Sequence, residues 1–201
     1  MPHEKFTPKN NNAPIANQTV NQNSRRRFIY SLGSALSLAA VEPVFALTNM
    51  PSAKEHRSLE LHHLHTGETL TSTYWNGLDY DSAALESINH VLRDFRTNDV
   101  YPIDGKLLDI LHTVRTELGV DAPFEVIGGY RSPKTNAMLR QRSNGVAKKS
   151  LHMQGRAIDV RMPDVNSAKL REVAADLHLG GVGYYRSSNF VHLDTGRPRV
   201  W

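Results

Sequence analysis

Ser150-Leu-His-Met-Gln-Gly-Arg-Ala-Ile-Asp159 is the stretch around which this chain is organised. The residues from Ala157 to Arg161 alternate in the manner of a β-strand, with Asp159 on one face and aliphatic side chains on the other. His152 comes from the loop before that strand, where Gly155 permits a close approach of the backbone. The stretch therefore brings an imidazole and a carboxylate toward one place.

A second strand, Phe190-Val-His-Leu-Asp194, carries His192 and Asp194 on one face and aliphatic residues on the other. If both aliphatic faces pack on the core, Asp159 and His192 share the opposite face of a common sheet. Two imidazoles and one carboxylate are a ligand set that holds Zn²⁺ and leaves a fourth position for water. His152, Asp159 and His192 are therefore the candidate ligands of one Zn²⁺.

The remaining pattern predicts an α+β fold in which an antiparallel sheet bears the zinc site and helices pack on it. Three further strands are expected at residues 59–64, 69–74 and 124–127. Four helices are expected: from Asp81 with apolar spacing through Phe95, from Asp104 to Leu118 with Gly119 as the stop, from Ser132-Pro133 to about Arg142, and from Asn166 through Leu177. Gly180 to Tyr185 is expected to turn the chain back into the sheet.

Arg131 stands on the turn between a strand and the helix that begins at Ser132-Pro133, where a scaffold can aim it into a cleft. Its guanidinium is expected either to stabilise an oxyanion or to bind a substrate carboxylate through two hydrogen bonds. The loop 143–149 is long and basic enough to border a substrate groove, although a charge run such as Lys148-Lys149 is more often simply solvated.

Other histidines do not form a second predicted metal site. His62 and His63 are adjacent on a strand and therefore point to opposite faces, and no acid follows His65 at ligand spacing. His90 and His112 lie on predicted helices as surface or supporting residues. His178, at a helix end, is expected to interact with the helix dipole.

Composition limits the chemistry. The chain has no cysteine, so thiolate zinc sites, cysteine nucleophiles and disulfides are excluded. The formal charge is +4, but five of the 24 basic and two of the 20 acidic residues lie in the first 46 positions, which leaves about +1 beyond them. A near-neutral domain gives no indication of a nucleic-acid partner.

The N-terminal part has the features of an export signal. Ser24-Arg-Arg-Arg-Phe-Ile29 is a twin-arginine pattern, and an apolar run and Val44-Phe-Ala46 follow it. The run is too short for a lasting membrane helix. We expect residues 1–46 to be a cleaved twin-arginine signal peptide with a disordered start, 47–58 a linker, and 59–201 a peptidase domain in the periplasm without stable membrane insertion.

These motifs resemble a known family. His152 to Asp159, Gly129-Tyr-Arg-Ser132 and the run from Gly180 through Gly196 are similar to the M15-type zinc D-Ala-D-Ala peptidases, which share a fold with the Hedgehog signalling domain. From Leu59 to Trp201 the chain resembles the periplasmic murein endopeptidases of that superfamily. The resemblance implies one Zn²⁺ on the three candidate ligands, peptidoglycan stem peptides as substrate, and hydrolysis of cross-links, for the closest relatives between two diaminopimelates.

The chain departs from that family at one catalytic position. Many M15 peptidases carry an acid three residues before the last zinc histidine as general base, and here Asn189 stands there. Asp194 is the candidate base, or alternatively it orients the His192 imidazole. A D-Ala-D-Ala carboxypeptidase and a non-catalytic, zinc-containing peptidoglycan-binding module are the alternative functions.

Overall fold

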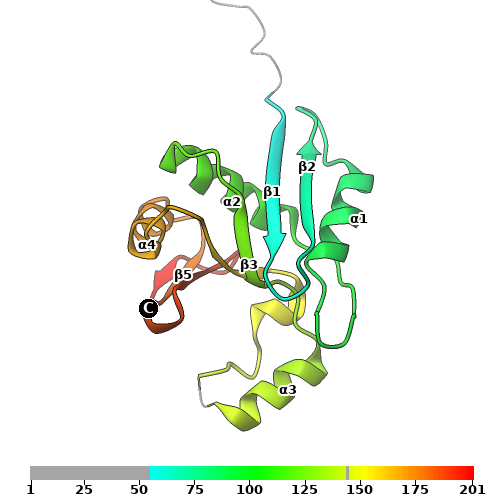
Figure 1. The fold of residues 1–201 in the computed structure, drawn as a ribbon, viewed down its shortest axis with the longest axis vertical. Coiled ribbons are helices and arrows are strands. Elements are labelled where there is room, and N and C mark those ends of the chain that lie inside the picture. The colour runs from blue at the N-terminus through cyan, green and yellow to red at the C-terminus, as the bar shows by residue number, and fades with distance from the viewer. Residues whose placement is uncertain (1–54, 144) are drawn as a thin grey trace, which may run out of the picture. The chain divides into compact units, whose positions relative to one another are not determined.

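The computed structural model describes residues 55–143 and 145–201, so the predicted signal peptide and most of the predicted linker lie outside the described residues. The elements are β1 (Arg57–His63), β2 (Thr69–Trp75), α1 (Ser82–Val91), α2 (Gly105–Leu118), β3 (Phe124–Gly128), α3 (Pro133–Arg142), the 3₁₀ turn η1 (Leu151–Gln154), β4 (Ala157–Arg161), α4 (Ser167–Asp176), β5 (Gly181–Tyr185), the 3₁₀ turn η2 (Arg186–Ser188), β6 (Phe190–Asp194) and β7 (Arg199–Val200) (Figure 1). The first strand begins at Arg57, two residues before the domain start expected at Leu59.

One sheet of seven strands, in the order β2-β1-β3-β4-β6-β5-β7, runs through the described residues. The α+β class is confirmed, but the sheet is mixed, because β1 pairs with β3 and β5 pairs with β7 in parallel. The antiparallel pairing predicted for the sheet therefore fails at β1–β3 and at β5–β7. The four strands that surround the site pair with one another in antiparallel fashion, in the order β3, β4, β6 and β5.

The predicted helix starts are confirmed by their caps. Asp81, Asp104, Ser132 and Asn166 each accept a hydrogen bond from a backbone N–H in the first turn of α1, α2, α3 and α4. Gly119 ends α2 in the left-handed conformation.

The first helix ends earlier than its apolar spacing predicted. α1 stops at Val91, and Phe95 lies beyond it, stacked on the His65 ring at a centroid distance of 4.0 Å. Asp94 explains the difference, because its buried carboxylate accepts the backbone N–H groups of Arg96 and Ser132 at 2.9 Å each and so replaces helical hydrogen bonds by a turn.

The core lies on one face of the sheet. Alternate aliphatic residues of β4 and β6, including Ile158, Val191 and Leu193, are at most 1% exposed there. α2 contacts β1 and α4, and α4 contacts β5 and β6, so these two helices cover that face (Figure 1). The opposite face of β4 and β6 is left to the polar residues, and α3 lies apart from the sheet. No helix among the described residues is long and apolar enough to cross a membrane.

Candidate metal centre and the cleft around it

The structure brings together the three residues predicted as metal ligands. His152 Nε2 lies 3.3 Å and His192 Nδ1 lies 2.9 Å from Asp159 Oδ1. The two imidazole nitrogens are 3.2 Å apart. Among the described residues this is the one group of three or more His, Asp or Glu side chains close enough to share an ion.

Strand register and two backbone contacts place these side chains. Asp159 on β4 is directly opposite His192 on β6, so the two face the same side of the sheet. His152 sits on η1 and is 2% exposed, and its own carbonyl accepts the Arg131 N–H at 3.1 Å. Gly155 ends η1 with a φ of 64°, in the left-handed region where a side chain would meet the Pro102 carbonyl.

Hydrogen bonding fixes which nitrogen of each ring faces the cluster. His152 Nδ1 is 2.7 Å from the Gly129 carbonyl, which only accepts, so Nδ1 carries the hydrogen and Nε2 is left with a lone pair. His192 Nε2 donates to Asp194 Oδ2 at 3.0 Å, which in the neutral ring leaves the lone pair on Nδ1, 2.9 Å from Asp159 Oδ1. With both rings neutral, two nitrogen lone pairs and a carboxylate oxygen therefore converge on one point.

This donor set fits a tetrahedral metal ion. Bonds of about 2.0–2.2 Å to nitrogen and oxygen place tetrahedral ligand atoms about 3.3–3.6 Å apart. The three separations seen here, 2.9, 3.2 and 3.3 Å, are at or slightly below that range. Buried acceptors that face one another repel unless a cation or a proton lies among them. The chemistry of the site thus suits a divalent ion with a ligand preference for nitrogen and oxygen.

The pKa values of His192 and Asp159 also indicate that the cluster favours a positive charge. Burial alone would lower the pKa of His192, but hydrogen bonds to Asp159 and Asp194 outweigh it and raise that pKa to about 8. Burial would likewise raise the pKa of Asp159, but the neighbouring His152 and His192 hold it well below its usual range. In the metal-free protein a proton on His192 takes the place that a cation would occupy.

Asp194 lies behind His192 rather than beside the cluster. It contacts Nε2, the ring nitrogen that points away from Asp159 and His152. The carboxylate is 1% exposed and also accepts from the backbone of Gly181 and Gly196. Arg199 completes the set with two hydrogen bonds of 2.6 and 3.0 Å. Of the two roles open from the sequence, this geometry favours orientation of the imidazole.

Arg131 lies at the edge of the cluster. One guanidinium nitrogen is 3.7 Å from Asp159 Oδ2, the carboxylate oxygen that does not face the histidines. Asn189, at the position of the family's catalytic acid, has a φ of 50° and bonds to Ser167, and it is not among the residues that line the cleft.

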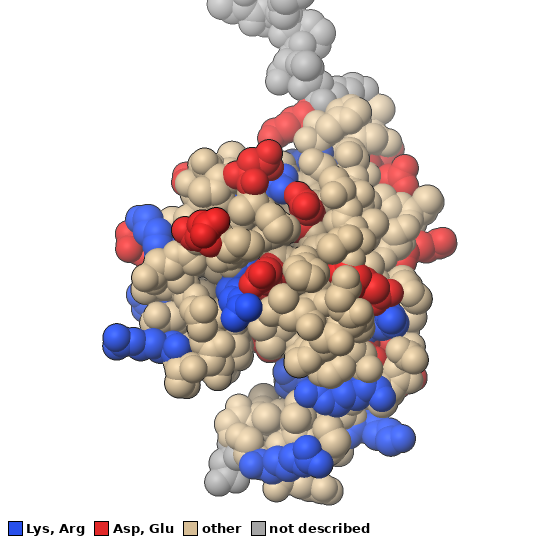
Figure 2. Space-filling model, in the orientation of Figure 1, with Lys and Arg blue, Asp and Glu red and all other residues tan. Residues whose placement is uncertain are grey.

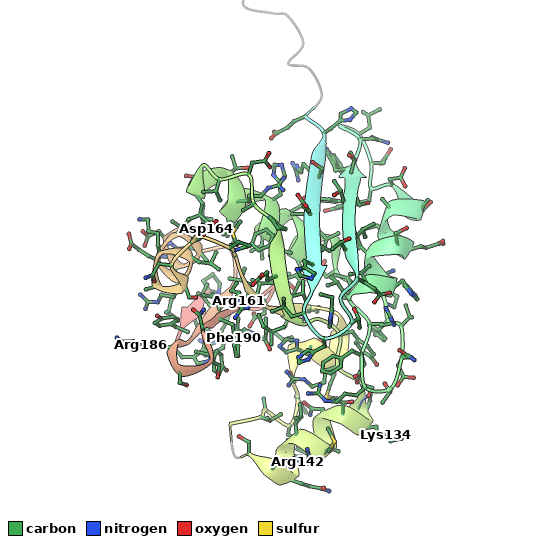
Figure 3. All side chains as sticks on the ribbon, viewed as in Figure 1. Lys134, Arg142, Arg161, Asp164, Arg186 and Phe190 are labelled. Atoms are coloured by element: carbon green, nitrogen blue, oxygen red, sulfur yellow. The ribbon has the colours of Figure 1, made fainter. Side chains whose placement is uncertain are left out.

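A cleft of about 490 Å³ opens in front of the cluster. One wall comes from loop residues between Ser143 and Leu151, and the other from Tyr185, Phe190, Arg199 and Trp201. Figure 3 shows Arg186 and Phe190 on the β5–β6 side and Lys134 and Arg142 on α3. Figure 2 shows the molecule hollowed between the main body and the lobe formed by α3, where Lys and Arg side chains gather. The stretch 143–151 contains Lys148 and Lys149 and no acid, and Lys149 lines the cleft, so this wall carries positive charge.

Sequence reasoning missed the C-terminal wall. Arg199 holds Asp194 in place, and its guanidinium lies 4.7 Å from the Trp201 ring. The Trp201 ring in turn lies 5.3 Å from the His192 ring. These contacts depend on the parallel pairing of β7 with β5, which has no local sequence signal. A hint was present in Gly183, where a side chain would collide with the Trp201 indole.

Comparison with known proteins identifies the family of this chain. The family model described as peptidoglycan L,D-endopeptidase MepK matches residues 51–201. The peptidoglycan L,D-endopeptidase MepK of Escherichia coli K12 is 41% identical over 178 residues, which are 89% of this chain and 97% of that protein. The probable peptidoglycan L,D-endopeptidase MepK of Haemophilus influenzae is 40% identical over 184 residues, which are 90% of this chain and 97% of that protein. The chain therefore belongs to the MepK family of the M15 peptidases.

Proposed function

We propose that this protein is a zinc-dependent murein endopeptidase that hydrolyses peptide cross-links of peptidoglycan, specifically the bond between two diaminopimelates. The observation that carries the proposal is the convergence of His152, Asp159 and His192, each of which offers one ligand atom to a common point. Membership of the MepK family supports the peptidoglycan substrate, and the relatives' name supports a bond of the L,D type.

The residues divide the chemistry among them. Zn²⁺ held by the three side chains would supply a Lewis acid and a water of lowered pKa at neutral pH. Arg131, at 3.7 Å from Asp159, is placed to donate hydrogen bonds to the carbonyl oxygen as it becomes an oxyanion. Asp194 keeps the His192 Nε2 protonated and so keeps Nδ1 free to bind the ion.

The proton that leaves the attacking water needs an acceptor in the cleft. Asp194 is the sequence candidate, but its carboxylate is filled by five hydrogen bonds and lies behind the ring. Asp159 Oδ2 is the carboxylate oxygen left free of histidine contacts at the cluster, with Arg131 as its nearest cation. We therefore assign the orienting role to Asp194. The neighbouring histidines hold the pKa of Asp159 well below its usual range, so Asp159 is a weak proton acceptor as well.

The shape of the cleft favours an endopeptidase over a carboxypeptidase. Besides the cleft of about 490 Å³, a second pocket adjoins the cluster through Arg131 and Asp159. A substrate can therefore extend from the scissile bond in two directions.

The remaining assignments rest on the sequence. We propose that residues 1–46 direct export by the twin-arginine route, that 47–58 link them to the peptidase domain, and that the protein works in the periplasm. We also propose that the mixed sheet with its helices is a variant of the Hedgehog/DD-peptidase fold.

Digestion of purified sacculi tests the function. Zinc-loaded protein should release muropeptides whose masses show loss of diaminopimelate cross-links, and His152→Ala should release none and bind no zinc. Release of D-Ala alone would indicate the carboxypeptidase. Tight sacculus binding without any release would indicate the binding module.

A further inference from the structure

A second pocket of about 120 Å³ adjoins the cleft and shares Arg131 and Asp159 with it. Its other walls include His65, Phe95 and Arg96. Part of this wall is the turn that follows α1, which the buried Asp94 holds in shape. The pocket is thus built by segments distant in sequence and opens beside the candidate metal centre.

Two guanidinium groups line this pocket without adequate partners. The Arg131 side chain is only 19% exposed, yet its nearest carboxylate oxygen, Asp159 Oδ2, is 3.7 Å away. That distance is too long for a hydrogen bond. Arg96 is exposed and lies over the Phe95 ring at 4.1 Å, and it forms no ion pair within the described part of the chain. Both groups retain N–H donors for a ligand.

The two cations act on one another across the pocket. Burial lowers the pKa of Arg131 most, Asp159 opposes this, and the positive charge of Arg96 lowers that pKa further. His65, on the same pocket, has its pKa lowered by burial and then by Arg96. Like charges held this close favour an anion between them.

The acids near the pocket are already engaged. Asp94 is 1% exposed and accepts the N–H groups of Arg96 and Ser132 at 2.9 Å each. Asp159 faces the two histidines of the cluster. The pocket therefore presents positive charge that no described carboxylate neutralises at hydrogen-bond distance.

We propose that Arg96 and Arg131 form a carboxylate-binding subsite for the substrate residue that supplies the amine of the scissile bond. Planar guanidinium groups match a carboxylate through paired N–H donors. Arg131 lines both the cleft and the pocket, so one edge of its fork can face the oxyanion while another faces this carboxylate.

Substrate chemistry fits this arrangement, and here the inference rests on the proposed function. Diaminopimelate is a diamino dicarboxylic acid, so the carbon that bears the cross-linked nitrogen also bears a carboxylate. That carboxylate is two bonds from the scissile nitrogen and stays free in the cross-link. A substrate whose amide reaches the cluster therefore brings an anion close to Arg131, with Arg96 as the second cation.

Two synthetic cross-linked peptides test the subsite: one with this carboxylate free, and one with it amidated. Hydrogen bonds to charged groups imply that the zinc-loaded wild type prefers the free acid by about tenfold or more in kcat/KM. Arg96→Gln should lose about tenfold on the free acid, mainly through KM, and be unchanged on the amide. Arg96→Lys should fall between. Arg171→Gln on α4, behind the other face of the sheet, removes the same charge and should match the wild type.

Calorimetric binding of the uncleavable amine product, as free acid and as amide, separates the subsite from the catalysis. If the wild type binds the free acid more tightly than the amide and Arg96→Gln does not, while no peptide is cleaved, the subsite stands and the hydrolase proposal falls. Equal acid preference in wild type and Arg96→Gln, by cleavage or by binding, would overturn the subsite even if both cleave well.

Discussion

Replacement of Asp194 by Asn tests how the candidate metal centre is held. All five hydrogen bonds to this carboxylate come from donors: His192 Nε2, the backbone of Gly181 and Gly196, and both terminal nitrogens of Arg199. An amide must turn its NH₂ toward some of these donors. The lowest-energy response is for His192 to move its hydrogen to Nδ1 and accept from the amide through Nε2.

That change of tautomer removes the lone pair that faces the cluster. Loss of a carboxylate that orients a metal-bound histidine costs about 10–100-fold in metal affinity, or roughly 1.4–2.8 kcal/mol. The metal-free fold should also lose about 1–3 kcal/mol, because the Arg199 guanidinium loses its charged partner and buried donors face an amide. If Asp194 were instead the general base, the ion would stay and only the rate would fall.

Zinc affinity by chelator competition and kcat at saturating zinc distinguish the two roles. We expect Asp194→Asn to bind zinc 10–100-fold more weakly and to recover most of its kcat when zinc is added. Asp121→Asn, at an exposed position, makes the same chemical change and should behave as wild type in both measurements. Wild-type zinc affinity combined with a kcat that added zinc does not restore would refute the orienting role.

Three further perturbations follow from the geometry. Gly155→Ala should lower the free energy of unfolding, measured in urea, by about 2–4 kcal/mol, because the new side chain is strained at positive φ and collides with a backbone carbonyl. Gly67→Ala, also at positive φ but in open space, should lower it by only about 1–2 kcal/mol. Equal losses of stability in the two variants would contradict the collision. In the metal-free protein the pKa of His192 is raised to about 8, so the zinc affinity should fall up to about tenfold per pH unit below pH 8. The stability that the bound proton gives should be lost as the pH rises from about 6.5 through about 8. A zinc affinity that does not change between pH 6 and pH 8 would contradict this. Arg131→Ala should lower kcat by about 10²–10³-fold with zinc content unchanged, as for loss of an oxyanion donor, and unchanged kinetics would reject that role.

The centre of the site was predictable because its geometry follows from local alternation. On β4 and β6 every second residue is aliphatic, so burial of that face decides where Asp159 and His192 point. The short antiparallel pairing of β4 with β6 then places Asp159 opposite His192. His152 could be placed because the glycine at 155 forces a turn immediately before the strand.

The surroundings of the site depend on contacts that no local pattern encodes. The parallel pairing of β5 with β7 brings Arg199 behind Asp194, and a two-residue strand leaves no periodicity to detect. The early end of α1 likewise depends on a tertiary hydrogen bond from Ser132 to Asp94 across 38 positions. The pocket that contains Arg96 could not be predicted for the same reason.

The charges around the candidate centre explain why its supporting residues matter for the chemistry. Asp194 is neutralised by Arg199 through two hydrogen bonds, and Asp159 lies beside the cationic Arg131. With both histidines neutral, these four charges cancel before any ion binds. No net negative charge of the protein would then offset the charge of a divalent cation at the cluster. That positive charge would stabilise the anionic transition state more than the neutral amide of the substrate. Removing Arg199 would leave Asp194 to offset part of that charge, so loss of this arginine should lower the rate even though it contacts Asp194 and none of the three candidate ligands.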